Sequence, residues 1–231
     1  METIEASASV AEIAFLAGQS DKDIYRLMNE HLLPEDLIAS VDHGRRLAAP
    51  LTAPIASFYF DAKDDLTAKA RLDAIFDIVG RLRARPDFDR FLRLDKSALG
   101  KFDWSVKRET YIVLLMPFVE LASERAARLV RATDHIVRND QILNGEPCFV
   151  GTRVPVANVV ASADAGVPLE ELIDDYPFLT ADLLEDARVY VATHPRAGRP
   201  RRLSDLEPGL KLTSRKVVRP ATRSRKAEND A

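Results

Sequence analysis

The sequence has 231 residues but only one cysteine, and this scarcity excludes several ways of holding a protein together. A single cysteine, Cys148, can form neither an internal disulfide framework nor a zinc cage with cysteine ligands. The four histidines are scattered along the chain and give no ligand pair at helical spacing. We therefore expect neither a structural metal nor a cofactor.

Long apolar runs are also missing. No run approaches the length that crosses a membrane. The first residues, METIEASASVAEIAF, lack the basic region followed by an apolar core that marks a secretory signal. These absences favour a cytoplasmic protein without a membrane partner.

The usual signatures of catalysis are absent as well. The segment GEPCFVGTR has no Gly-Lys-Ser/Thr after its glycines, so it does not match a phosphate-binding loop. Cys148 has no recognisable histidine pattern that would activate it. Asp174 and Asp175 are neighbours on a predicted helix, where they point in different directions instead of forming a carboxylate pair. We expect a protein that is not an enzyme.

Charge is divided unevenly along the chain. From Arg196 to the end there are 11 Lys and Arg residues against 4 Asp and Glu residues, a balance of +7. Subtracting these from the totals of 33 and 36 leaves 22 against 32 for residues 1–195, a balance of −10. A basic tail on an acidic body indicates an anionic partner for the tail. The tail has little apolar periodicity, which is typical of a segment that orders on binding.

The N-terminal segment predicts two short helices with a turn at Gly18. Ser9 and Glu12 have the spacing of a capping box for the first helix, and Ser20 is placed to cap the second. Apolar residues of the two helices are spaced to pack together, which favours a helix-turn-helix, although a plain helical hairpin gives a similar pattern. The side chains that we expect to contact DNA are Ser20, Lys22, Tyr25, Arg26 and Asn29 on the second helix, with Arg45 and Arg46 on a following wing or loop, although a solvated turn explains these two arginines equally well.

The central segment predicts a mixture of strands and helices. The pattern indicates an irregular stretch over residues 35–60 that ends in a short strand, IASFYF, then an amphipathic helix up to Pro86. FDRFLRL and TYIVLLM are interpreted as short strands around a turn, with Trp104 as a core residue. A helix after Pro117 then leads to a domain boundary at about residue 132. The apolar stripe of the amphipathic helix is Leu72, Ile75, Phe76, Val79 and Leu82.

The next segment predicts a hairpin turn at Asn144–Gly145 followed by three helices that share one core. The first two of these helices, joined at Gly166, again resemble a helix-turn-helix. Before them, we expect Gly151 to allow a tight turn, Thr152 to cap the first helix and Pro155 to lie in its first turn. Arg153 fits two roles equally well: an exposed contact with DNA or a partner, or an ion pair with an acidic residue of the same domain.

Residues 134–195 carry spaced residues that resemble a small prokaryotic family of domains of unknown function. That pattern has G-x-P and G-T-R-x-P-V, then a glycine, an isoleucine and Y-P-x-L-T. The matching residues are Gly145, Pro147, Gly151, Thr152, Arg153, Pro155, Val156, Gly166, Ile173, Tyr176, Pro177, Leu179 and Thr180. With the helix pair in front and the basic tail behind, the whole is similar to a VapB-type antitoxin subgroup of type II toxin–antitoxin modules.

The resemblance implies a protein that binds and inhibits a PIN-like ribonuclease toxin and represses its own operon by binding operator DNA. The active site of such a nuclease is a cluster of carboxylates, which suits the guanidinium groups of the tail. Leucines of the tail are apolar anchors in the same interpretation. The tail residues expected to bind the toxin are Arg196, Arg199, Arg201, Arg202, Leu203, Leu206, Arg215, Lys216 and Arg219.

The fold class that we predict is mainly α with small β elements, in three parts. These are a helix-turn-helix DNA-binding domain over residues 1–132, a signature helical domain over 133–195 and a toxin-binding tail over 196–231. We expect a homodimer, because an acidic monomer binds nucleic acid poorly. The alternative functions are a freestanding helix-turn-helix regulator with a ligand- or partner-sensing domain, and a plain assembly module.

Overall fold

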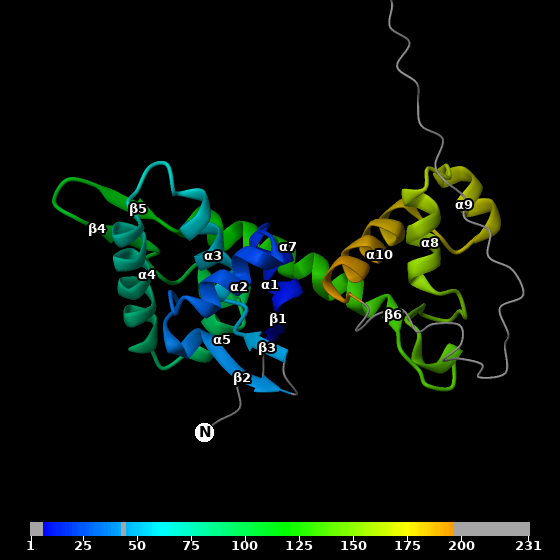
Figure 1. Ribbon diagram of the computed structural model, residues 1–231, viewed down its shortest axis with the longest axis horizontal. Coiled ribbons are helices and arrows are strands. Elements are labelled where there is room, and N and C mark those ends of the chain that lie inside the picture. Colours follow the sequence, from blue (N-terminus) through cyan, green and yellow to red (C-terminus); the bar gives the residue numbers. More distant parts are fainter. Residues whose placement is uncertain (1–6, 43–44, 196–231) are drawn as a thin grey trace, which may run out of the picture. The chain divides into compact units, whose positions relative to one another are not determined.

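The computed structural model describes residues 7–42 and 45–195 (Figure 1). The chain divides into two units, residues 1–195 and residues 196–231, and the elements below all belong to the first. This unit is mainly helical with a few short antiparallel strand pairs, so the predicted α+β class is confirmed. Its buried side chains form a larger and a smaller hydrophobic core.

The predicted helix pair is present at the front of the chain. Strand β1 (Ala8–Ser9) leads into α1 (Val10–Ala17), and α2 (Asp21–Asn29) follows after a turn. Ser9 and Glu12 form the predicted capping box, and the Ser20 hydroxyl caps α2 by accepting from the Asp23 amide. These caps satisfy amide groups that a helix start leaves without partners.

A three-stranded antiparallel sheet follows the helix pair. After a 3-10 turn at Glu35–Leu37, strands β2 (Ile38–Asp42) and β3 (Arg45–Ala48) form a hairpin, and β3 also pairs with β1, giving the order β1-β3-β2. The sequence predicted an irregular stretch here. The strands were missed because β2 is short and its pairing with β3 contains an irregularity between Ala39 and Asp42.

Residues predicted as a strand, IASFYF, belong to helix α3 (Thr52–Asp61). The helix is surrounded by the core, and Ile55, Ala56 and Phe58 are all almost fully buried. A helix that is buried on every side shows no polar face, so its apolar run cannot be distinguished from a buried strand by periodicity. The hydroxyl of Ser57 donates to the carbonyl of Ala17 at 2.9 Å, which ties α3 to α1.

Helix α4 (Ala68–Arg83) is the predicted amphipathic helix, but its stripe is shifted: Ile78 is buried, whereas Phe76 is 51% exposed. The segment FDRFLRL is wrong as a strand, because α5 (Phe88–Leu92) covers it and α6 (Lys96–Leu99) follows. Strands β4 (Ser105–Lys107) and β5 (Ile112–Leu114) form a hairpin. Trp104 is buried as predicted, and its indole donates to the Leu99 carbonyl at 2.9 Å.

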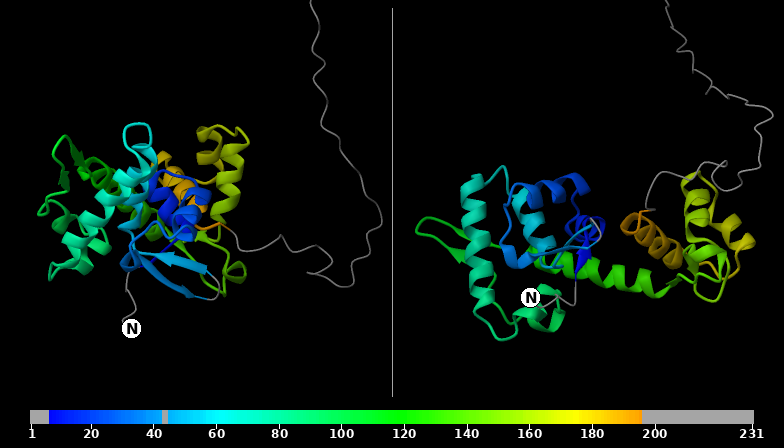
Figure 2. Two further views of the ribbon diagram at one scale, coloured as in Figure 1. Left: turned by 60° about the vertical axis from the view of Figure 1, so that its left-hand side comes forward. Right: turned by 60° about the horizontal axis from the view of Figure 1, so that its bottom comes forward.

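Helix α7 (Met116–Asp134) belongs to both cores. Val119 and Ala122 lie in the larger core, and Ala132 lies in the smaller one. The boundary predicted at residue 132 therefore falls inside a continuous helix. Figures 1 and 2 show α7 running from the elements of the larger core to α10 (Ala181–Thr193).

The smaller core contains the predicted three helices, α8 (Val156–Asp164), α9 (Leu169–Asp175) and α10. In front of them β6 (Ile136–Val137) pairs with β7 (Cys148–Phe149). Asn144 and Gly145 both have positive φ, at 55° and 78°, as their turn chemistry predicts. They do not form a two-residue hairpin turn, however, because the connection extends from 138 to 147 and contains a 3-10 turn at Leu143–Gly145.

Candidate nucleic-acid interface

Helix α2 separates its buried and exposed side chains sharply. Ile24, Leu27 and Met28 are buried against the core, and this burial fixes the helix on α1. The opposite face carries polar groups, and Tyr25 among them is 47% exposed. All five residues predicted on this helix are exposed: Ser20, Lys22, Tyr25, Arg26 and Asn29. The face therefore has the amide, hydroxyl and cationic groups that contact phosphates and base edges.

Arg26 is paired with Glu30 one turn further along the surface. The Nε atom of Arg26 lies 3.0 Å from Glu30 Oε1, and the two side chains are 56% and 48% exposed. The hydrogen bond and charge of Glu30 raise the pKa of Arg26, so the guanidinium stays cationic. An exposed pair of this kind is worth little in water, so a phosphate can replace Glu30 as the partner of Arg26.

The β2–β3 hairpin lies beside the end of α2. A guanidinium NH group of Arg46, on β3, donates to the side-chain oxygen of Asn29, and both residues are exposed. Helices α1 and α2 are thus joined by a tight turn and followed by a hairpin whose strand β3 also pairs with β1, the strand before them. Arg46 is exposed on strand β3 of this hairpin, while the side chain of Arg45 falls outside the described part of the structure.

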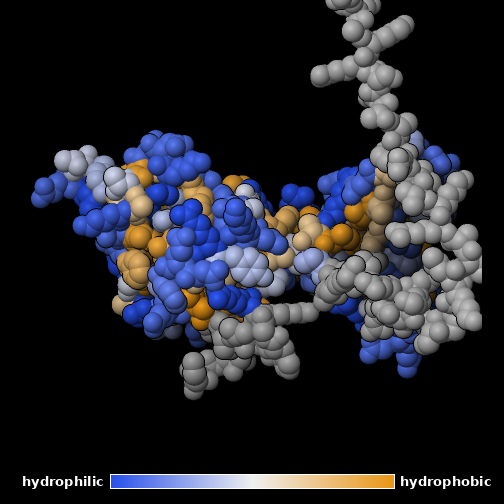
Figure 3. All heavy atoms as spheres, in the orientation of Figure 1, coloured by the Kyte–Doolittle hydropathy of each residue, from blue (hydrophilic) through white to orange (hydrophobic). Residues whose placement is uncertain are grey.

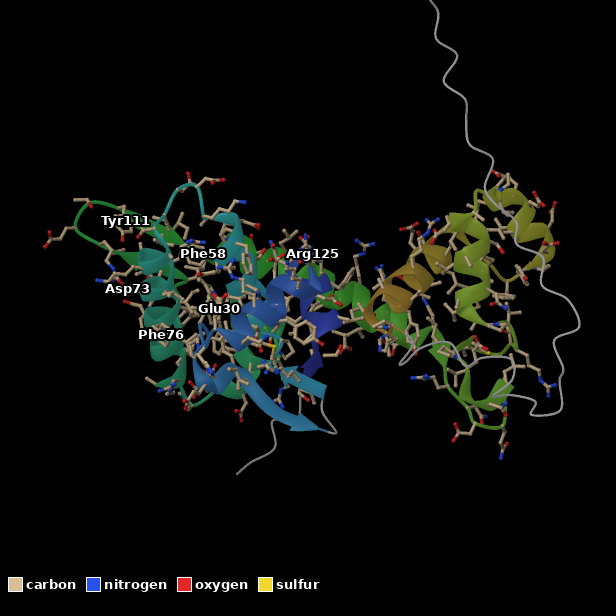
Figure 4. The ribbon with its side chains drawn as sticks, viewed as in Figure 1. Glu30, Phe58, Asp73, Phe76, Tyr111 and Arg125 are labelled. Carbon is tan, nitrogen blue, oxygen red and sulfur yellow. The ribbon has the colours of Figure 1, made fainter. Side chains whose placement is uncertain are left out.

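The turn between the two helices is held by a residue that sequence reasoning missed. Gly18 has φ 67°, a left-handed conformation that glycine adopts without strain. Arg125 of α7 donates from Nη1 to the Leu16 carbonyl at 3.1 Å, and its guanidinium lies where a side chain on Gly18 would begin. Figure 4 shows Arg125 beside α1. No local signal marks Arg125, because 109 positions separate it from Leu16.

The second helix pair, α8 and α9, presents a different surface. Gly166 has φ 95° between them, as a turn glycine does. Helix α9 carries Glu170, Glu171, Asp174 and Asp175, all exposed, and its seven residues include no Lys or Arg. A row of carboxylates repels the phosphates of DNA. Helix α9 is therefore more acidic than α2, in which Lys22 and Arg26 balance Asp21 and Asp23.

The signature residues build a turn and a core, with Arg153 projecting from them. Gly151 has φ 76° and open space around it, and Val156 is buried. Thr152 does not cap α8 as predicted: it donates to the Phe149 carbonyl and accepts from the Val154 amide, which closes the turn before the helix. Pro155 is the residue that precedes α8, one position before the first turn in which it was expected.

Arg153 is exposed and forms no ion pair with any residue of 133–195, all of whose side chains the structure describes. Of its two predicted roles, the ion pair within the domain is thus absent from the described structure. Tyr176 and Pro177 follow α9 at the surface of the smaller core, and the Tyr176 ring lies 6.2 Å from that of Phe178.

Cys148 is enclosed in the pairing of β6 with β7. It is fully buried, and its Sγ lies 3.4 Å from the Glu146 carbonyl. Burial raises the pKa of the thiol, because a thiolate is poorly solvated there. A buried thiol held in its neutral form is a weak nucleophile.

The predicted toxin-binding residues, from Arg196 to Arg219, lie outside the described residues. In the part of the chain that is described, every helix is too short or too polar to traverse a bilayer. Within that same part, no three His, Cys, Asp or Glu residues are grouped so that they could hold a metal ion.

Comparisons with known proteins show the family to which this chain belongs. A model of a domain family described as protein of unknown function (DUF433) matches residues 136–191, which reach from β6 into α10 and include the signature residues. The uncharacterized protein y4eO of Sinorhizobium fredii is 38% identical over 221 residues, covering 95% of this chain and 96% of that protein. The chain therefore belongs to the same family as y4eO.

Among solved structures, a crystal structure of Rv2018 from Mycobacterium tuberculosis is similar over 81% of this chain and 98% of that chain. Its sequence identity is 17% and its TM-score is 0.35.

Proposed function

We propose that this protein is a DNA-binding antitoxin that acts as a homodimer. Helix α2 and the β2–β3 hairpin contact operator DNA, and the basic segment after Pro195 binds and inhibits a PIN-like ribonuclease toxin. The observation that carries the DNA-binding part is the exposed polar face of α2, with Asn29 joined to Arg46 of the hairpin. The toxin-binding part is supported by the sequence resemblance and by the +7 charge of residues 196–231.

The physical case for DNA rests on geometry and local charge. The helix caps and the buried inner face fix α2 on α1 and leave its outer face exposed. An α-helix has the width that fits the major groove of DNA. Lys22, Arg26 and Arg46 supply cations on this surface, while Asp21 and Asp23 lie at the N-terminus of α2, where carboxylates stabilise a helix. The acidic body limits non-specific binding, so a second copy is needed for affinity.

The antitoxin part is tested by asking whether a neighbouring gene encodes a nuclease and by assaying that nuclease with this protein. We expect the full chain to copurify with that nuclease and to inhibit its cleavage of RNA. A truncated chain that ends at Pro195 should keep its melting temperature, because residues 1–195 form a unit of their own, and should lose inhibition. Unchanged inhibition by the truncated chain would contradict the role of the tail. The absence of any nuclease gene nearby would favour a freestanding regulator instead.

The DNA-binding part is tested separately by fluorescence anisotropy with the DNA upstream of the gene. The full chain should bind this DNA more tightly than a scrambled duplex of equal length, by about 10³-fold or more at physiological salt. Equal binding to both duplexes would exclude a repressor function, whatever the outcome of the nuclease assay.

A further inference from the structure

Strand β5 exposes two aliphatic side chains on one face. Ile112 and Leu114 are each 59% exposed, while Val113 between them is buried against the larger core. Side chains alternate along a strand, so Ile112 and Leu114 point to the same side. Tyr111, just before the strand, is 39% exposed. Ile112 and Leu114 therefore form an exposed apolar pair on one face of the hairpin.

The backbone of β5 is also open along one edge. Val106 of β4 is opposite Val113, and the flanking bonds run from Arg108 N to Tyr111 O and from Leu115 N to Trp104 O. Because hydrogen-bonding positions alternate in an antiparallel pair, the amide and carbonyl groups of Ile112 and Leu114 point away from β4. Over residues 7–42 and 45–195, no second strand pairs with this edge.

The edge is short, at three residues, but it carries no side chain or bulge of the kind that keeps a strand from pairing with another chain. Native edges are commonly protected by a lysine, a proline or a bulge, and Ile112–Leu114 has none of them. The hairpin is fixed on the body because Val106 and Val113 are buried in the larger core, and Arg108 Nη1 also lies 3.3 Å from Asp77 Oδ2 on α4. In Figures 1 and 2 the hairpin projects past α4, where it is accessible to another molecule.

Helix α4, which Arg108 of the hairpin contacts, exposes one more apolar side chain. Arg108 Nη2 also reaches the Asp73 carbonyl at 3.4 Å, and Phe76, one turn further along the helix, is 51% exposed. Figure 4 labels Tyr111, Asp73 and Phe76 at this end of the molecule, and Figure 3 shows hydrophobic residues at the surface beside α4. The occupant of this surface therefore presents both an extended strand and apolar side chains.

We propose that β5 pairs with β5 of a second copy of this chain, in antiparallel fashion about a two-fold axis at Val113. The strand is self-complementary in this register: Ile112 of one copy lies opposite Leu114 of the other, and both side chains are apolar. No charge on Ile112–Leu114 opposes the pairing. A four-stranded sheet results, and it satisfies the outward backbone groups of both copies.

The choice of a second copy over a different protein rests in part on the proposed function, which requires two helix pairs on one operator. The test is independent of DNA. Sedimentation velocity of the full chain should show a dimer at micromolar concentration. The variant Ile112→Lys with Leu114→Lys should weaken self-association by about tenfold or more, because ammonium groups of the two copies would lie opposite each other in place of the apolar pairs.

The control is Val150→Lys, since Val150 is 58% exposed but lies on the signature turn. This variant should remain dimeric. A monomeric wild-type chain would overturn the proposal, as would a double variant that dimerises as strongly as wild type. Either result leaves DNA binding by the α1–α2 pair to be decided by its own assay.

Cross-linking supplies a second measurement that does not depend on charged substitutions. Ile112→Cys chains mixed with Leu114→Cys chains should be joined by a short bismaleimide, whereas mixing Val150→Cys chains with Leu114→Cys chains should give no such product. Cys148 is buried and does not compete for the reagent. Equal cross-linking in both mixtures would contradict the register.

Discussion

The guanidinium of Arg46 on β3 donates a hydrogen bond to the side-chain oxygen of Asn29 at the end of α2. This bond joins the hairpin to the helix that we propose as the DNA-reading element. Both partners are exposed, so the bond contributes little to folding and mainly fixes the relative position of two surfaces. Sequence analysis placed both residues at the interface but gave no reason for them to meet.

Asn29→Ala should therefore weaken operator binding more than it affects stability. We expect about a tenfold loss of affinity, since a side chain that reads or positions a base contact is worth about 1–3 kcal/mol. The melting temperature should change little, because exposed substitutions usually fall within about 0.5 kcal/mol. Anisotropy titrations and thermal melts check the two expectations. A loss of stability that matches the loss of affinity would show that Asn29 acts through the fold.

Gly18→Ala should destabilise the protein by about 1–2 kcal/mol, because alanine is strained at φ 67°. The new Cβ would also lie 2.6 Å from Arg125 Nη1 and displace it from the Leu16 carbonyl. Gly80→Ala is the matched control: it lies inside α4, nothing is within 4 Å of the added carbon, and it should stabilise by about 0.5–1 kcal/mol. Urea unfolding measures both. Equal effects of the two substitutions would contradict the left-handed turn.

Asp186→Asn should loosen the contact between α7 and α10. The Asp186 side chain is only 5% exposed, and its oxygens lie 3.1 Å from His135 Nδ1 and 3.5 Å from Arg131 Nη2. Without the carboxylate charge, the interactions with the His135 imidazole and the Arg131 guanidinium weaken. We expect the free energy of unfolding to fall by about 1–3 kcal/mol. Glu185→Gln is the control, because its pair with Arg188 is exposed and should be worth less than about 1 kcal/mol. A smaller effect at Asp186 than at Glu185 would be incompatible with this contact.

Cys148 should react slowly with a thiol reagent in the native protein. Burial encloses the sulfur and raises its pKa, so the thiolate forms only at higher pH than in an exposed cysteine. In denaturant the reaction should be rapid and stoichiometric. An Ellman assay under the two conditions provides the comparison, and rapid labelling of the folded protein would place Cys148 at the surface instead.

Local signals in the sequence determined much of the fold. The caps at Ser9 and Ser20, the turn at Gly18 and the three helices after Pro155 follow from residues close to one another. Helix α3 was mistaken for a strand because burial on all sides removes the polar face that periodicity requires. The β2–β3 hairpin and the position of Phe76 depend on tertiary packing, which no short pattern reports.

The candidate site was predictable in its residues but not in its geometry. The exposed set on α2 follows from helical spacing, whereas the hydrogen bond of Arg46 to Asn29 spans 17 positions and the support from Arg125 spans 109. The four carboxylates of α9 are visible in the sequence, but the sequence does not show that all four are exposed. Only this exposure makes α9 a less suitable surface for DNA than α2.

The central claim, that α2 contacts DNA, is tested most directly by the affinity of the Lys22→Ala, Arg26→Ala double variant for operator DNA at several salt concentrations. We predict that the affinity falls by at least about tenfold. The slope of log affinity against log salt concentration should become less steep by the equivalent of about two phosphate contacts. The control is Lys96→Ala with Lys101→Ala, which removes the same charge from another exposed site and should bind like wild type. Wild-type affinity in the first variant, or a loss seen only with Arg153→Ala, would contradict the claim.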